Sequence, residues 1–255
     1  MNKIKFLGTA GGRFVVSKQL RSSGGIWISL DGANILLDPG PGSLVRCVSS
    51  KPKLNPRNLD GIIVSHRHLD HSNDVNIMIE AMTNGGWDKK GVLFAPRELL
   101  DDDPVVLKYV RDYLDKIEIL KEKGKYKIGN ISFETPIKHI HHKVEGYGFN
   151  ILGKNNSISI ITDTAYFDGL ESYYKGDVHI INVVFYKDKK HFQHFDLEDA
   201  GKIISANKPK LTILTHFGMT MVKARPWELA ENLSKKYGVK VIAARDGMEI
   251  DLDNY

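Results

Sequence analysis

Residues 61–71 read Gly-Ile-Ile-Val-Ser-His-Arg-His-Leu-Asp-His, an apolar run followed by three histidines and an aspartate. The apolar run predicts a short buried strand, and the polar cluster would lie on the loop after it, where a sheet presents ligands. In an extended segment alternate residues face the same side, so His66, His68 and Asp70 can point together, with His71 toward a neighbouring position. Imidazoles and a carboxylate suit zinc and other transition metals. The stretch therefore predicts a two-metal site of the kind that hydrolases use.

On both sides of this loop, along the whole chain, the sequence predicts short apolar strands that alternate with amphipathic helices. A turn at 31–34 between two apolar runs predicts a β-hairpin over 26–38. Helices are expected at 43–50, 73–82, about 101–114, 197–206 and 227–237. Each half begins with strand hairpins and continues with strand–helix units. We therefore expect an α/β fold in one domain, residues 1–255, with the site between two stacked halves.

The composition is that of a globular chain. Of 255 residues, 42% are hydrophobic and 26% are charged, so the chain can bury a substantial core. The net charge of +5 suits an anionic substrate, although a solvated lysine-rich surface explains it as well. The single cysteine, Cys47, excludes an intramolecular disulfide and a thiolate cluster. Without a long apolar run or a signal-like N-terminus, we expect no membrane association and a cytoplasmic location.

The pattern of residues 66–71 matches His-x-His-x-Asp-His, and the sequence resembles the metallo-β-lactamase superfamily over nearly its whole length. Residues 142–149 are especially similar to the corresponding stretch of tRNase Z proteins, a phosphodiesterase branch. The resemblance implies an αββα four-layer sandwich and a metal-dependent hydrolase. The long Gly/Pro-rich arm with which tRNase Z grips tRNA has no counterpart, because only a short hairpin fits between Phe149 and Asp163.

The resemblance also implies a ligand set. One metal ion would be held by His66, His68 and His142, and the other by Asp70, His71 and His216. Asp163 would bridge both ions, and Asp38 would brace the metal loop. Two divalent ions are expected, with zinc first and manganese or iron as alternatives.

Several histidines have competing interpretations. His139 and His141 could replace His142, since strand alternation puts those two on one face and His142 on the other; the family match favours His142. His194 resembles an extra histidine of the phosphodiesterase branch, and we expect it to be catalytic with Asp70, as a general acid or a phosphate contact. His191 is expected on a charged surface loop.

Two stretches depart from the family pattern. The family often has glycine three residues after the last histidine of its signature, where this chain has Asp74, a residue suited to capping the next helix. Residues 85–130 follow the metal loop as extra material with a Lys-rich hairpin. They predict either a substrate-covering insert or an ordinary peripheral helix and hairpin.

The leading functional hypothesis is cleavage of a phosphodiester, in a nucleotide or a nucleic acid, by attack of metal-bound hydroxide. The same metal site could instead cleave a thioester, a lactone or another acyl bond. A di-iron redox protein and a metal-binding non-enzyme are weaker alternatives. The sequence leaves open whether the chain forms a homodimer.

Overall fold

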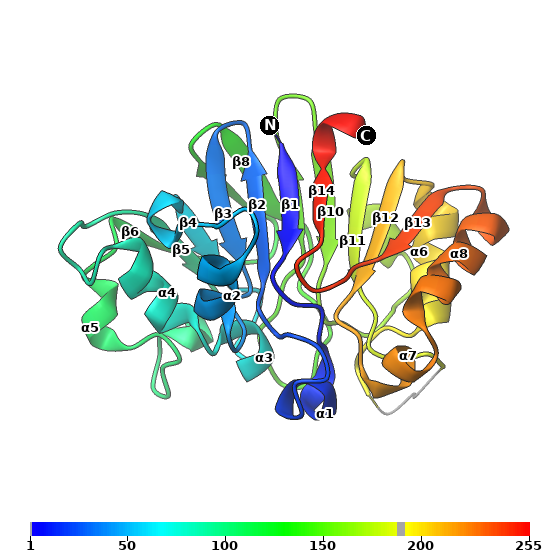
Figure 1. Ribbon diagram of the computed structural model, residues 1–255, viewed down its shortest axis with the longest axis horizontal. Helices are drawn as coiled ribbons and strands as arrows, with labels where there is room; N and C mark the ends of the chain where they lie inside the picture. Colours follow the sequence, from blue (N-terminus) through cyan, green and yellow to red (C-terminus); the bar gives the residue numbers. More distant parts are fainter. Residues whose placement is uncertain (1, 188–191) are drawn as a thin grey trace.

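Two seven-stranded sheets pack face to face, and helices cover the outer side of each (Figure 1). The computed structural model describes residues 2–187 and 192–255, so His191 lies outside the described residues. The strand orders are β14-β1-β2-β3-β4-β5-β6 and β13-β12-β11-β10-β9-β8-β7. The expected αββα sandwich is confirmed.

The elements have the following bounds. The first sheet contains β1 (Lys3–Phe6), β2 (Ile26–Leu30), β3 (Ala33–Leu37), β4 (Gly61–Ile63), β5 (Val92–Ala95), β6 (Lys116–Ile119) and β14 (Glu249–Asp251). The second contains β7 (Gly124–Ile128), β8 (Ile131–Thr135), β9 (Phe149–Leu152), β10 (Ser157–Ile161), β11 (Val178–Asn182), β12 (Leu211–Thr215) and β13 (Lys240–Ala243). The helices are α1 (Gly12–Ser17), α2 (Ser43–Ser49), α3 (Leu69–Ser72), α4 (Val75–Met82), α5 (Lys108–Arg111), α6 (Leu197–Asn207), α7 (Met219–Lys223) and α8 (Pro226–Tyr237). Four short 3₁₀ turns are η1 (Pro56–Asn58), η2 (Arg97–Leu99), η3 (Leu170–Tyr173) and η4 (Leu252–Asn254).

Three apolar layers hold these elements together. The central layer lies between the sheets and combines residues such as Ile63 of β4 with Ile180 of β11. One outer layer packs α4 on the first sheet, and the other packs α6 and α8 on the second. In β11 the neighbouring Ile180 and Ile181 enter different layers. A parallel strand covered on both faces is apolar on both faces, which explains its continuous apolar run.

The parallel parts of the two sheets place the polar cluster. β3 to β6 run parallel, and so do β10 to β13. Asp38, His66, Asp163 and His216 each follow the carboxyl end of one of these strands within three residues. Carboxyl ends of parallel strands gather at one edge of a sheet, where ligands bind in open α/β folds. This edge faces downward in Figure 1, on the side of α1 and α3.

The helix expected at 101–114 is confined to α5, Lys108–Arg111. Asp101 to Asp103 form bends and Pro104 has no regular structure. Pro104 disfavours helical backbone at the residue before it. The backbone N–H of Val106 then donates to the carbonyl of Leu99, which closes a loop rather than a helical turn.

Residues 85–130 are built into the sandwich. They supply β5 and β6 at one edge of the first sheet and β7 at one edge of the second. None of them lines the hollows around the histidine cluster in the described part of the chain. Strand pairing thus holds parts of the segment in the sheets, and the expectation of a substrate-covering insert stays a prediction.

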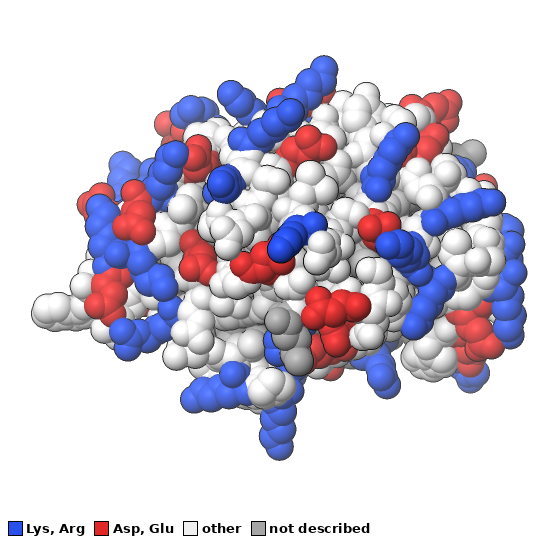
Figure 2. All heavy atoms as spheres, turned by 90° about the horizontal axis from the view of Figure 1, so that it is seen from above, with Lys and Arg blue, Asp and Glu red and all other residues white. Residues whose placement is uncertain are grey.

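Charges of both signs are dispersed over the face that carries the chain termini (Figure 2). Lysine and arginine lie between aspartate and glutamate there, without one continuous basic surface. The basic excess therefore does not mark this face as a site for a polyanion. Within residues 2–187 and 192–255, no helix combines the length and apolarity needed to cross a bilayer.

Candidate metal centre

Three histidine nitrogens form a compact triangle at the edge of the sandwich. His68 Nδ1 lies 3.1 Å from His66 Nε2 and 3.0 Å from His141 Nε2. A tetrahedral zinc ion holds nitrogens at about 2.0–2.1 Å, which places neighbouring ligand nitrogens about 3.4 Å apart. The triangle therefore has the size that one metal ion requires, and the three residues can form a metal group.

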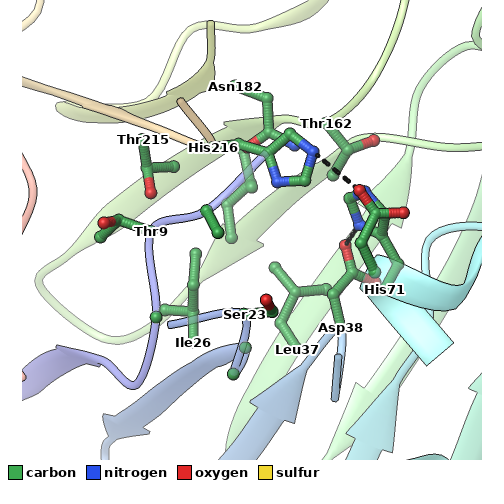
Figure 3. A pocket seen from close by; sticks show the side chains of 16 residues that line it. Thr9, Ser23, Ile26, Leu37, Asp38, His71, Thr162, Asn182, Thr215 and His216 are labelled. Carbon is green, nitrogen blue, oxygen red and sulfur yellow. Dashed lines mark hydrogen bonds and ion pairs between the residues drawn. The ribbon is translucent and has the colours of Figure 1, made fainter. Parts of the chain in front are cut away.

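A second group lies beside it and includes a carboxylate. Asp70 Oδ2 lies 3.5 Å from His216 Nε2 and 3.9 Å from His71 Nε2. The ring centroids of His71 and His216 lie 4.6 Å apart, and Figure 3 shows both side chains on the same side of the pocket. These residues come from α3 and from the end of β12, so the two sheets contribute to one group.

Asp163 lies between the two groups. Its Oδ2 is 3.4 Å from the Nε2 atoms of both His71 and His216 and 3.9 Å from His141 Nε2. Its Oδ1 accepts a hydrogen bond of 2.8 Å from the Asn182 side chain. One carboxylate oxygen thus reaches both groups, as a bridging ligand must, while the other is held by the protein.

Several buried nitrogens at the centre lack a hydrogen-bond partner. They are His71 Nε2, His216 Nε2 and His194 Nδ1. An unpaired buried polar atom costs about 1–3 kcal/mol, so native proteins rarely leave such atoms together. A divalent metal ion would satisfy the first two. The donor set of imidazole nitrogens and carboxylates therefore fits a pair of such ions.

Outer hydrogen bonds fix how the rings face the centre. His71 Nδ1 donates to Asp38 Oδ2 over 2.8 Å, and His141 Nδ1 donates to the carbonyl of Gln193 over 2.9 Å. Asp38 also accepts from the N–H and the hydroxyl of Ser65, so it braces the loop that carries His66. A proton on Nδ1 leaves the Nε2 lone pair of each ring free for a metal.

The structure places His141, rather than His142, beside His66 and His68. His141 is 2% exposed, whereas His142 is exposed, has its ring centroid 5.8 Å from that of His68, and forms a separate possible metal group with His141 and His194. The alternation argument assumed a strand, but no strand lies between β8 and β9 in this fully described stretch. The chain turns at His142, whose φ of 49° is in the left-handed region, so the expected order of faces does not apply.

Two supporting residues were missed from the sequence. Asn182, which holds Asp163, ends β11 between the strands that lead to Asp163 and His216, so its place at a parallel strand end could have identified it. Tyr174 donates to the buried His139 over 2.6 Å. His139 was considered as a ligand, but it lies behind the centre in this network and next to Thr162.

His194 also lies beside Asp163. The distance from His194 Nδ1 to Asp163 Oδ2 is 3.3 Å. Asp196, two residues later, caps α6 by accepting from the N–H of Asp199, and Phe195 is buried. The backbone N–H groups of Val184 and Phe185 donate to the Phe195 carbonyl. Helix cap and core therefore fix the position of His194 beside the candidate centre.

The two groups differ in protonation. Burial, followed by the charge of a neighbouring histidine, lowers the pKa of His68 and that of His66; for His68 it falls to about 4. Burial also lowers the pKa of His141 to about 4. Burial acts in the same direction on His71, but the carboxylates of Asp163, Asp38 and Asp70 outweigh it and raise that pKa well above its ordinary value.

A hollow of about 500 Å³ opens over the centre, lined by His68, Asp70 and Asp163 together with α1 residues. Gly12 also lines this hollow, whereas Gly11 is required by the packing of the backbone. A Cβ on Gly11 would lie 2.1 Å from the carbonyl oxygen of His216, so only glycine allows the loop to pack on that residue. Asp74 is the N-cap residue of α4, as expected, but its side chain makes no capping hydrogen bond; its carboxylate accepts from the N–H of Leu44 in α2 instead.

Comparison with known proteins agrees with this geometry. The beta-lactamase superfamily domain matches residues 33–217. An uncharacterised protein of Methanocaldococcus jannaschii is 30% identical over 99% of this chain and 96% of its own length. A ribonuclease Z of Archaeoglobus fulgidus is 32% identical over 37% of this chain and 29% of its own length.

Two solved structures share the fold. The metallo-β-lactamase fold protein YhfI from Bacillus subtilis has a TM-score of 0.80 at 20% identity, with 98% of each chain covered. The short form of human tRNase Z has a TM-score of 0.73 at 17% identity, with 98% of this chain and 99% of that chain covered. With its fold, its histidine and aspartate groups and its domain match, the chain belongs to the metallo-β-lactamase fold hydrolases of the beta-lactamase superfamily.

Proposed function

We propose that this protein hydrolyses a phosphodiester bond in a nucleotide or a nucleic acid, with the help of two divalent metal ions. The observation that carries the proposal is His194, a half-buried histidine whose buried Nδ1 has no hydrogen-bond partner and lies beside the shared carboxylate. The ribonuclease Z relative and the tRNase Z fold neighbour support the choice of bond.

The proposed ligand set follows the two groups. His66, His68 and His141 would hold one ion, and Asp70, His71 and His216 the other, with Asp163 shared between them. Zinc is the metal we expect first, with manganese or iron as alternatives. Two such ions supply an acidified water and neutralise charge on the phosphoryl oxygens.

The two candidate catalytic residues have separate tasks. Burial raises the pKa of Asp70, but His71 and His216 lower it by more, so the carboxylate is charged at neutral pH and can accept a proton from the attacking water. Burial lowers the pKa of His194, so its ring is neutral at neutral pH. A neutral imidazole still donates one hydrogen bond, to a phosphoryl or a leaving oxygen.

Turnover of bis(p-nitrophenyl) phosphate with zinc, manganese or cobalt tests the proposal, with a thioester assayed in parallel. We expect hydrolysis of the diester and its loss in His68→Ala. We expect His194→Gln to keep its metal content and to lose about 100-fold or more in kcat, as for a residue that assists proton transfer. Asp168→Asn, an exposed residue of the loop after Asp163, is the matched control and should behave as wild type.

Two results would contradict the proposal. Diester turnover no higher than that of His68→Ala would remove the phosphodiesterase assignment. Efficient thioester cleavage without diester cleavage would assign the same centre to acyl chemistry.

A further inference from the structure

A second hollow, of about 370 Å³, lies next to the metal centre. It shares His142 and His194 with the hollow over the metal ligands, so the two hollows adjoin at these residues. Its volume falls within the range of about 300–1,000 Å³ that is usual for small-molecule sites. A group attached to the reacting phosphate would have room here.

Aromatic and apolar side chains line this hollow. Phe14 and Phe192 remain 64% and 51% exposed, although large apolar side chains are usually covered. The rings of Phe185 and Phe192 lie 5.6 Å apart, and Met219 of α7 adds to the lining. Open aromatic faces beside a catalytic centre suit a flat aromatic ligand.

Part of the lining has no side chains. Gly12, with a φ of 68°, and Gly218 both contribute to it. A Cβ on Gly218 would lie 2.4 Å from the carbonyl oxygen of Val184, so no larger residue fits there without moving the backbone. Gly218 therefore serves the close packing of the backbone at this side of the hollow, and neither glycine adds a side chain to the lining.

Arg13 joins the apolar hollow to the metal centre. It lines both hollows and is exposed, and it has no ion-pair partner among residues 2–187 and 192–255. A guanidinium is well suited to phosphate oxygens. Arg13 therefore lies between the aromatic lining of the second hollow and the metal ligands that line the first.

We propose that the second hollow binds the nucleobase of the substrate, stacked on Phe14 and Phe192, while Arg13 contacts the phosphate. This inference rests on the proposed phosphodiesterase function and adds the place where the base of that substrate binds. The aromatic faces and Arg13 favour a base over an alkyl chain, since stacking on aromatic side chains tolerates any base and a neighbouring phosphate needs a cation.

Calorimetric binding of AMP and of ribose 5-phosphate to the zinc-loaded protein tests the inference, because these ligands differ only by the base. We expect AMP to bind about 5- to 150-fold more tightly, the range that stacking on an aromatic side chain provides. Phe14→Ala and Phe192→Ala should each remove most of that difference, and Phe14→Tyr should keep it. Trp87→Ala, which removes an 88% exposed aromatic remote from the hollow's lining, is the control and should not change it.

Equal binding of AMP and ribose 5-phosphate would overturn the inference, as would an AMP preference that survives both alanine variants. Tighter binding of hexyl phosphate than of AMP would assign the hollow to an apolar chain. The two proposals fail separately. Base-dependent binding without diester turnover would support the base site and contradict the phosphodiesterase function. Diester turnover without a base preference would support the phosphodiesterase function and contradict the base site.

Discussion

The two sides of the candidate metal centre are built from different chemistry. One side is the histidine triangle of His66, His68 and His141, whose nitrogens lie 3.0–3.1 Å from their nearest neighbours. The other combines His71 and His216 with the carboxylate of Asp70. Asp163 is the residue that both sides share.

The difference predicts unequal behaviour toward protons and metals. Burial keeps the triangle neutral near pH 7, because the pKa values of His68 and His141 fall to about 4. On the carboxylate side, Asp163, Asp38 and Asp70 outweigh burial and raise the pKa of His71, so in the metal-free protein that ring is a cation with a second proton on Nε2, which a metal ion must replace. A metal ion would enter the triangle without displacing a proton and would replace one on the other side.

The largest effect is expected from Asp163→Asn, which removes the charge shared by both sides. Metal affinity on both sides should fall by more than the about 100-fold that loss of an outer partner can cost. Metal content after gel filtration and diester turnover measure this. Asp168→Asn is the matched control, and an Asp163→Asn protein that retained two ions would refute the shared role.

His141→Ala and His142→Ala form a pair that tests the triangle. We expect His141→Ala to lose the ion of the triangle and most of the activity, since the ring that faces His68 is gone. His142→Ala should keep both ions, because this exposed side chain is outside the triangle. The reverse pattern in a metal analysis would restore His142 as the ligand.

Asp38→Asn should weaken metal binding on the carboxylate side more than in the triangle. The asparagine keeps the shape but loses the charge that holds the His71 ring. Competition with a chelator should show a loss of about 10–100-fold in affinity for one ion, as is typical for outer partners. A similar loss for the ion in the triangle would mean that Asp38 acts on the whole loop through Ser65.

The smallest expected effect is a difference in the number of protons that metal binding releases on the two sides of the centre. In His141→Ala, which keeps the carboxylate side, metal binding at pH 7 should release about one proton from His71, and affinity should rise by up to about tenfold per pH unit. In His216→Ala, which keeps the triangle, affinity should be flat above pH 6, because the pKa values of about 4 leave these rings unprotonated. Calorimetry in buffers of different ionisation enthalpy measures both, and equal release would contradict the comparison.

Much of the fold could be predicted from periodicity, because buried parallel strands and amphipathic helices leave strong local patterns. The hairpin of β2 and β3 at Asp31 and Gly32 is one example, and α8 is another. The helix expected at 101–114 failed because its apolar spacing competes with Pro104 and a backbone hydrogen bond that closes a loop.

The candidate site was predictable where its residues follow strand ends, as His66, Asp163 and His216 do. It was not predictable where the chain has no regular structure. Around His142 a left-handed turn decides which of two adjacent histidines faces inward, and no sequence period encodes that turn. The pairing of residues 85–130 into both sheets likewise depends on contacts between distant segments.

The most direct test is a crystal structure of the zinc-loaded protein with anomalous data at the zinc edge. The account predicts two peaks for each chain. One should lie among His66, His68 and His141, and the other among Asp70, His71 and His216, with Asp163 between them. A single peak, or a peak held by His142 in place of His141, would contradict it.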